Sequence, residues 1–305
     1  MKSLLLTVAI CTWNRCALLE QTLERMRNLV VPPRVRWELL VVNNNCTDQT
    51  DTVISSFSER LPIRRIFEPQ PGQTYARNSA INAARGELMI WTDDDVLVGC
   101  DWLQNYTAAS AKYADASFFG GQILPWFEGS PPEWLATHWR SVESAYAVRD
   151  LGSQHQKFTN QMLPYGANFA VRMDKQRKYS FDVNIGLRPG STMRGDETTL
   201  LKQMLDDGLE GMWIPEARVQ HFIPKTRQTT KYLWNYAIGQ GQQIQKSSRV
   251  INQRHLLGKP RWLWRATMQA SIQYHFSRCF GGPADWLPLM MKYGRLYGRL
   301  SNSPQ

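Results

Sequence analysis

The chain has 305 residues, of which 43% are hydrophobic and 20% are charged, and its formal net charge at pH 7 is +10. These proportions are those of a folded globular protein, so they exclude a wholly disordered chain and fit one main domain with a smaller addition. No stretch approaches the roughly 20 apolar residues of a membrane span, so any membrane contact is expected to be peripheral.

The positive charge is concentrated near the end of the sequence. Residues 225–305 contain 13 Lys and Arg and a single acid, Asp285, whereas residues 1–224 contain 23 Lys and Arg and 25 acids. The tail also carries four tryptophans, at Trp234, Trp262, Trp264 and Trp286. Basic residues mixed with aromatic ones suit an anionic membrane surface or a packed partner, and we expect no nucleic-acid partner.

The cysteines indicate the compartment. The five of them are odd in number, scattered and without a Cys-x-x-Cys pair: Cys11, Cys16, Cys46, Cys100 and Cys279. This pattern disfavours a disulfide framework and a structural zinc site. The apolar run Leu4–Ile10 is too short for a signal peptide and is interpreted as a strand. We therefore expect a cytoplasmic protein, with the inner face of the cell membrane as a peripheral location.

The first hundred residues alternate between apolar runs of strand length and segments of helical period, as parallel α/β proteins do. Strands are predicted at Leu4–Ile10, Leu39–Val42, Ile63–Phe67 and Leu88–Thr92. Helices are predicted between them. The first is indicated by apolar residues spaced on one helical face, namely Leu19, Leu23, Met26 and Val30.

Three aspartates, Asp93, Asp94 and Asp95, directly follow the fourth predicted strand. Adjacent carboxylates repel one another unless a cation or hydrogen bonds compensate, so the cluster predicts a Mg²⁺ or Mn²⁺ site. A solvated acidic turn is the alternative that these residues alone leave open. The segments 11–15 and 43–48 also follow strands, and ligands of open α/β sheets bind at the carboxyl ends of strands. Three loops therefore predict one site.

The second half of the sequence has a less regular pattern. A turn and strand are predicted over Tyr165–Val171, a helix over Asp196–Leu209 and a short strand over Gly211–Ile214. From about Lys231 the pattern is helical, with two apolar stripes. One stripe is Met268, Ile272, Phe276 and Phe280; the other is Trp286, Met290, Tyr293, Tyr297 and Leu300. We expect one domain over residues 1–230 and a basic, Trp-rich helical extension over residues 231–305.

Five segments in this order resemble the inverting glycosyltransferase family 2. They are Ile10–Arg15, Val41–Asp48, Ala76–Asn78, Ala84–Glu87 and Thr92–Asp95. The resemblance covers about residues 4–224. It implies an α/β fold of the GT-A type, a Rossmann-like nucleotide-binding domain with a mixed, mainly parallel central sheet. It also implies a metal-dependent, hexosyltransferase-type enzyme that moves a sugar from a nucleotide-diphosphate-sugar to a hydroxyl acceptor, a glycan or lipid-linked glycan of cell-surface polysaccharide synthesis.

The resemblance assigns the donor site. Residues expected to bind the nucleotide-sugar are Thr12, Trp13, Arg15, Asn43, Asn44, Arg77, Asp93 and Asp94. Trp13 suits stacking on the base, and a base stack contributes roughly 1–3 kcal/mol. Asn43 and Asn44 stand where the family has acids, which leaves the base open. The guanidinium fork of Arg77 suits a diphosphate.

The metal and acceptor sites also follow from the resemblance. Asp95 is assigned to Mg²⁺ or Mn²⁺ and Asp93 to the ribose side, with Asp93 and His221 as further metal ligands and Asp94 able to share either role. The metal would stabilise the departing nucleoside diphosphate. Asn168, in the turn Gly166–Asn168, is assigned to an acceptor hydroxyl, and a plain turn residue is its other interpretation.

An inverting transfer needs a base for the acceptor hydroxyl, and Asp196–Glu197 resembles the acidic pair of the family in reversed order. The register favours Glu197 and leaves Asp196 open. Two other functions remain to be tested. A sugar-phosphate nucleotidyltransferase would need a glycine-rich loop after the first strand, where this chain has no glycine. A non-catalytic basic protein that binds nucleic acid or membrane would not bind nucleoside diphosphate with Mn²⁺.

Overall fold

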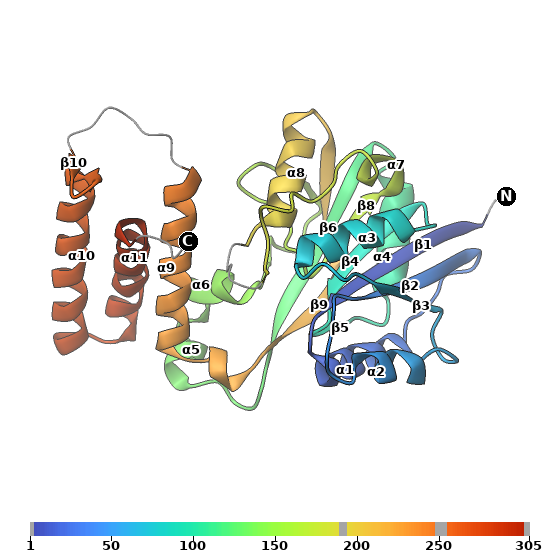
Figure 1. Cartoon of the computed structure of the whole chain (residues 1–305), viewed down its shortest axis with the longest axis horizontal. Coiled ribbons are helices and arrows are strands. Elements are labelled where there is room, and N and C mark those ends of the chain that lie inside the picture. Colours follow the sequence, from blue (N-terminus) through green and yellow to red (C-terminus); the bar gives the residue numbers. More distant parts are fainter. Residues whose placement is uncertain (1–2, 189–193, 248–254, 302–305) are drawn as a thin grey trace. The chain divides into compact units, whose positions relative to one another are not determined.

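The computed structural model describes residues 3–188, 194–247 and 255–301 (Figure 1). The chain forms two compact units: Met1–Trp126 with Ala147–Phe222, and Phe127–Tyr146 with Ile223–Gln305. This division differs from the boundary expected between residues 230 and 231. The C-terminal part of the second unit begins at Ile223, and the unit also includes the internal segment Phe127–Tyr146, which no periodicity in the sequence connects to the tail.

A mixed sheet forms the centre of the first unit, with the strand order β3-β2-β1-β4-β8-β6-β9-β5 and with β7 paired to β9. The strands are β1 Leu4–Thr12, β2 Val35–Asn43, β3 Ile63–Phe67, β4 Leu88–Asp93, β5 Val96–Val98, β6 Ala116–Phe127, β7 Gln156–Lys157, β8 Phe169–Arg172 and β9 Glu210–Ile223. Strands β1 to β4 run parallel, and β8 joins β4 in the antiparallel sense. The α/β class predicted from the sequence is confirmed.

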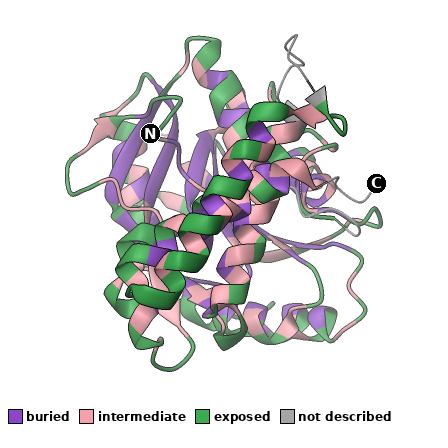
Figure 2. Cartoon of the chain, turned by 90° about the vertical axis from the view of Figure 1, so that its left-hand side faces the viewer, coloured by how far each residue is buried: buried purple, intermediate pink, exposed green. Residues whose placement is uncertain are grey.

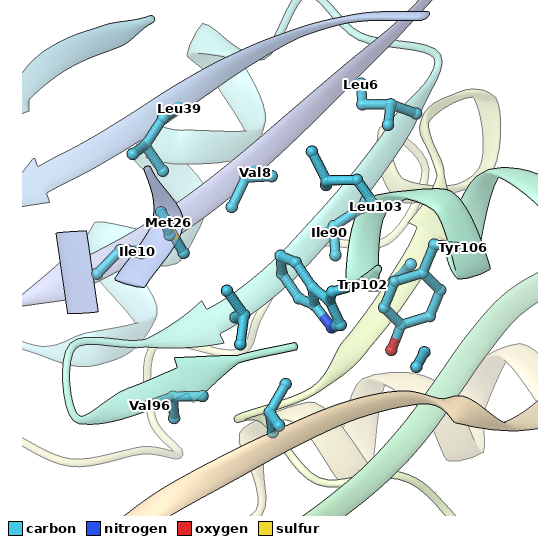
Figure 3. Packing of buried hydrophobic residues seen from close by; sticks show 14 of the residues in the cluster. Leu6, Val8, Ile10, Met26, Leu39, Ile90, Val96, Trp102, Leu103 and Tyr106 are labelled. Atoms are coloured by element: carbon cyan, nitrogen blue, oxygen red, sulfur yellow. The ribbon is translucent and has the colours of Figure 1, made fainter. Parts of the chain in front are cut away.

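Helices cover both faces of this sheet, which is why its parallel strands are apolar on both sides. The helices of the first unit are α1 Cys16–Met26, α2 Thr50–Ser56, α3 Gln73–Ala83, α4 Trp102–Lys112, α7 Met173–Gln176 and α8 Asp196–Asp206. Alternate residues of β1 enter different cores. Leu6 and Val8 pack on the face that contains Trp102 of α4 (Figure 3). Ala9 packs on the opposite face, which contains Leu200 of α8.

Four elements differ from the sequence prediction. Helix α1 ends at Met26, so Val30 lies outside it and is half exposed. Helix α4 and strand β6 occupy a region that the sequence left irregular. Strand β9 runs from Glu210 to Ile223 because buried and exposed residues alternate beyond Pro215, a period of two that its polar residues conceal.

The second unit is helical, as the sequence predicts for the tail. Its elements are α5 Glu133–Thr137, α6 Trp139–Val142, η1 Glu143–Tyr146, η2 Lys225–Arg227, α9 Thr230–Ser247, β10 His255–Leu256, β11 Lys259–Pro260, α10 Arg261–Phe280 and α11 Pro283–Leu300. The Tyr232 hydroxyl donates to the Ala145 carbonyl at 2.9 Å, and its ring stacks on that of Tyr146. These contacts attach the internal segment to α9.

Helix α11 packs against both α9 and α10. Small residues allow the close approach to α9: a Cβ on Gly294 would lie 2.7 Å from the Cβ of Ala237, and one on Gly298 would overlap the Ile238 carbonyl. Trp286 and Met290 of α11 are buried. Within the described residues, no helix has both the length and the apolar character that crossing a membrane requires.

Candidate active site

Parallel pairing brings the predicted loops to one edge of the sheet. Cys11 of β1 lies opposite Asp93 of β4, and Thr12 lies opposite Asn43 of β2. The Thr12 hydroxyl then donates to Oδ2 of Asp94 at 2.7 Å. The sequence prediction that these loops converge is therefore confirmed. Asp94 and Asp95 are buried, and Asp93 is partly exposed, so the cluster is not a solvated turn.

Arg15 compensates two of the three aspartates. Its Nη1 lies 3.0 Å from Oδ1 of Asp94 and 2.9 Å from Oδ2 of Asp95. Burial, together with the charge of Asp95, raises the pKa of Asp94 to about 7. Asp94 therefore has its carboxylate oxygens directed at Thr12 and Arg15, which makes it a support of the loop. Its expected contact with the donor stays a prediction.

His221 lies beside Asp95 because β9 pairs with β5. The pairing sets His221 opposite Val96, and the Phe222 amide donates to the Asp95 carbonyl at 2.9 Å. Nε2 of His221 is 3.5 Å from Oδ1 of Asp95, and its Nδ1 is buried without a hydrogen-bond partner. Strand β9, which the sequence predicts only over Gly211–Ile214, is thus the element that brings this histidine to the aspartates.

Arg77 lies among three carboxylates and is buried. Its Nη1 is 2.6 Å from Oδ2 of Asp196 and 3.6 Å from Oε2 of Glu197, and its Nη2 is 3.8 Å from Oδ1 of Asp93. The side chain is only 3% exposed. This corrects the expectation that Arg77 presents its fork to a diphosphate, because the guanidinium is enclosed by carboxylates of its own chain.

Aromatic rings and a glycine complete the surroundings of Arg77. Its guanidinium carbon lies 5.1 Å from the ring centre of Phe181 and 6.0 Å from that of Trp91, within cation–π range. A Cβ on Gly166 would lie 2.5 Å from the Nη2 atom of Arg77. Gly166 thus leaves the space that Arg77 fills. No motif in the sequence marks Phe181 or Trp91, although Gly166 stands in a turn that the sequence singles out.

The acidic pair begins α8 after Gly195, which adopts a left-handed conformation at φ 94°. The two acids differ in their surroundings. Asp196 is 3% exposed and faces Arg77, whereas the Glu197 side chain is 14% exposed. Burial, followed by the charge of Asp196, raises the pKa of Glu197 to about 7. A carboxylate with a pKa near neutrality is suited to accept a proton at physiological pH.

Asn43 and Asn44 hold loops together within the protein. The Asn43 amide donates to Asp51 at 2.6 Å, and its oxygen accepts from the Cys46 amide at 2.8 Å. Asn44 donates to two carbonyls of the segment 68–70 and accepts from the Gly72 amide at 2.8 Å. Both side chains are buried and shape these loops, and the contact with the nucleotide that was expected of Asn43 and Asn44 stays a prediction.

Trp13 remains available for a base. It is 52% exposed and lies between buried Thr12 and Asn14, which has a φ of 52°. The Asn14 oxygen accepts from the Thr47 amide at 2.7 Å, which joins the loop after β1 to the loop after β2. The loop is therefore fixed by its neighbours while the indole stays exposed, and the stacking role of Trp13 stays a prediction.

Asn168 does not line the site. It is fully buried, and its oxygen accepts from Trp102 Nε1 at 2.9 Å and from the Tyr106 hydroxyl at 2.8 Å. Its nitrogen donates to the carbonyls of Gln122 and Ala217 at 3.0 and 2.7 Å. All four bonds of the amide are made inside the protein. This corrects the expected contact with an acceptor hydroxyl.

The protein alone supplies only some of the ligands that a divalent cation needs. Among the described residues no group of three or more His, Cys, Asp and Glu side chains is arranged to hold a metal. Asp95 with His221, whose Nδ1 has no partner, offers one oxygen and one nitrogen ligand. Mg²⁺ typically takes one or two carboxylates together with substrate phosphate oxygens and water, so this sparse set fits a metal that arrives with a diphosphate.

Comparison with known sequences assigns the chain to a family. A model described as Glycosyl transferase family 2 matches residues 7–208. Validoxylamine A glucosyltransferase of Streptomyces hygroscopicus subsp. limoneus is 35% identical over 150 residues, 48% of this chain and 33% of that protein. The chain thus spans about a third of the length of that relative. The succinoglycan biosynthesis protein ExoM of Rhizobium meliloti (strain 1021) is 21% identical over 244 residues, 79% of this chain and 74% of the relative.

Comparison with solved structures supports the same fold. The mannosyltransferase PcManGT from Pyrobaculum calidifontis, solved in complex with GDP-Man and Mn²⁺, matches with a TM-score of 0.60 and 17% identity. The match covers 97% of this chain and 85% of that one. The GT-A fold predicted from the sequence is confirmed by this likeness.

Proposed function

Because the chain belongs to glycosyltransferase family 2, we propose that it is an inverting, hexosyltransferase-type enzyme that moves a sugar from a nucleotide-diphosphate-sugar to an acceptor hydroxyl. The acceptor is a glycan or a lipid-linked glycan of cell-surface polysaccharide synthesis. One observation carries the proposal: Arg77 lies within 4 Å of Asp93 on the donor side and of Glu197 at the start of α8. The carboxylate expected to bind the donor, Asp93, and a candidate base of suitable pKa, Glu197, therefore lie beside the same guanidinium.

On the donor side, Trp13 stacks on the base and Asp93 accepts from the ribose. Both assignments are supported by access, since Trp13 is half exposed and the Asp93 side chain is 29% exposed. Thr12, Asp94 and Arg15 hold the loops through their mutual hydrogen bonds. Arg15 is 38% exposed, so it keeps a face toward the diphosphate while it pairs with the aspartates.

Asp95 would hold Mg²⁺ or Mn²⁺, with His221 and Asp93 as the nearby candidates for a second ligand. When bound, the ion would neutralise the charge that develops on the departing nucleoside diphosphate. The structurally similar mannosyltransferase PcManGT was solved in complex with GDP-Man and Mn²⁺, which supports this choice of ion. Arg15 supplies positive charge to Asp94 and Asp95 on the same side.

Glu197 is the general base of this proposal. As the acceptor oxygen attacks the anomeric carbon, its proton passes to the Glu197 carboxylate, and the bond to the diphosphate oxygen breaks on the opposite face of the sugar. A positioned base contributes roughly 10²–10⁴-fold in rate. Asp196 is already paired with Arg77 at 2.6 Å, which supports a positioning role for it rather than proton transfer.

The experiment that tests this function is a nucleotide-sugar screen. The full chain is mixed with Mn²⁺ and each donor in turn, and a donor that binds the native state raises the melting temperature. Donors that bind are then incubated with glycan acceptors. Release of nucleoside diphosphate with gain of a sugar supports the proposal. Release of pyrophosphate would instead identify a nucleotidyltransferase, and absence of any nucleotide binding would contradict both enzymes.

A further inference from the structure

The two apolar stripes of the helical unit differ in what covers them. Trp286 and Met290 on α11 are 3% and 2% exposed. The stripe on α10, formed by Met268, Ile272, Phe276 and Phe280, is exposed by 64%, 63%, 67% and 79%. We call these four residues the α10 stripe. A contiguous line of large exposed apolar side chains is uncommon on a protein surface and marks an interaction site.

The α10 stripe does not belong to the core of its own unit. The residues of α10 that are buried are Leu263, Thr267 and Ala270, which lie on the other side of the helix. Helix α10 uses that side to pack against α11. Figure 2 shows exposed residues along the helix that faces the viewer. The packing of the unit is thus complete without the stripe.

Positive charge continues the same line. Arg261 and Arg265 are exposed and precede Met268 at spacings of four and three residues, so they extend the α10 stripe toward the start of the helix. Helix α10 has no acidic residue. Residues 225–305 contain 13 Lys and Arg and one acid. Helix α10, which carries the stripe, therefore has basic residues and no acidic ones, and the sequence around it has a large excess of positive charge.

We propose that the α10 stripe is a membrane-docking face: α10 lies in the plane of an anionic bilayer, with the stripe among the acyl chains and the arginines among the headgroups. An amphipathic helix with apolar residues on one side and basic residues beside them binds anionic lipid in this way. A second copy of the chain is the less suitable partner, because it would bring like charge against like charge. The inference does not depend on the proposed transfer reaction.

Vesicle co-sedimentation of the full chain tests the proposal. Vesicles of phosphatidylcholine alone are compared with vesicles of phosphatidylcholine and phosphatidylglycerol in equal parts. We expect binding to the anionic vesicles only, and weaker binding as salt increases, because added salt screens the charges. Replacing the α10 stripe by Met268→Ser, Ile272→Ser, Phe276→Ser and Phe280→Ser should reduce the bound fraction about tenfold or more, since the inserted apolar area is lost.

Two further variants make the result specific. Arg261→Gln with Arg265→Gln should weaken binding to anionic vesicles and reduce its salt dependence. Val30→Ser with Val31→Ser removes exposed apolar residues from the first unit and should bind as the unchanged chain does. Melting curves and nucleotide-diphosphate binding verify that each variant is folded, and these readouts also report separately on the proposed function.

The proposal is overturned if the unchanged chain does not bind anionic vesicles at low salt. It is also overturned if the four-serine variant binds these vesicles with the same affinity as the unchanged chain. Light scattering decides the alternative. A dimer in solution that the four-serine variant converts to a monomer would show that a second copy covers the stripe, and the membrane proposal would then be rejected.

Discussion

The Nη1 atom of Arg77 lies 2.6 Å from Oδ2 of Asp196, and each side chain is only 3% exposed. Glu197 and Asp93 lie at 3.6 and 3.8 Å from the same guanidinium, so one cation faces three carboxylates. Breaking a buried ion pair by removing one partner leaves an uncompensated charge, which typically destabilises a protein by about 3–5 kcal/mol. The pair therefore fixes both the fold of the site and the charge that Glu197 experiences.

Replacing Arg77 should move the pH dependence of transfer. The positive charge favours the ionised form of Glu197, so its loss raises the pKa of Glu197 above about 7. A base acts when it is deprotonated. The acidic limb of the pH–rate profile of Arg77→Gln should accordingly move to higher pH by on the order of one unit, measured on donor turnover.

The controls for Arg77 separate charge from folding. Arg77→Lys keeps the charge and should leave the limb close to its original position, even if the rate falls. The double change Arg77→Gln with Asp196→Asn removes both members of the pair and should regain stability relative to Arg77→Gln alone. An unchanged limb in folded Arg77→Gln would exclude electrostatic control of Glu197 by this arginine.

The second prediction distinguishes the two acids. Glu197→Gln should lower the turnover number by roughly 10²–10⁴-fold and leave donor affinity within a few-fold, because a base acts in the transition state. Asp196→Asn removes a negative charge that favours protonated Glu197, so its acidic limb should move to lower pH. Steady-state kinetics across pH measures both. A fully active Glu197→Gln with an inactive Asp196→Asn would assign the base to Asp196.

Much of the fold could be predicted because parallel strands have a simple pattern. Runs such as Leu39–Val42 are buried on both faces, and their continuous apolar character is local in the sequence. Strand β9 could not be predicted in full, since Glu216, Arg218 and Gln220 interrupt the apolar run. Its pairing with β5 depends on residues more than a hundred positions apart, and no local pattern contains that information.

The candidate site could likewise be predicted only in part from the sequence. The position of Asp93–Asp95 and of Glu197 follows from where a strand ends and a helix begins, which the sequence indicates. The partner of each side chain does not follow from position. A guanidinium binds a phosphate or a carboxylate equally well. Arg77 pairs with the Asp196 carboxylate because the fold brings the start of α8 next to it, which the sequence does not indicate.

Metal binding gives the third prediction. Asp95→Asn removes one charge from a carboxylate that lies beside His221 and Arg15, so Mn²⁺ affinity in the presence of nucleoside diphosphate should fall at least tenfold. The loss of the free Mn²⁺ signal in electron paramagnetic resonance measures binding without turnover. Asp115→Asn, an exposed acid of the same unit, is the matched control. Removal of divalent ions by a chelator should stop transfer, and readdition should restore it.

Undiminished Mn²⁺ binding by Asp95→Asn would remove this residue from the metal site. His221→Gln should weaken Mn²⁺ binding less than Asp95→Asn, because a neutral nitrogen ligand contributes no charge. If both variants bind Mn²⁺ as the unchanged chain does, the ion would be held by the diphosphate alone, and the protein would act on it only through the other residues of the site.

The last prediction concerns Asn168, whose amide makes four hydrogen bonds inside the first unit. Asn168→Ala leaves the Trp102 indole N–H and the Tyr106 hydroxyl without their acceptor, and it opens a cavity under α4. Each unsatisfied buried group costs about 1–3 kcal/mol, so the free energy of unfolding should fall by about 2–5 kcal/mol. Urea unfolding measures this fall. At temperatures where the variant is folded, its KM for acceptor should remain within a few-fold of the original. A stable variant with a strongly raised acceptor KM would instead return Asn168 to the acceptor site.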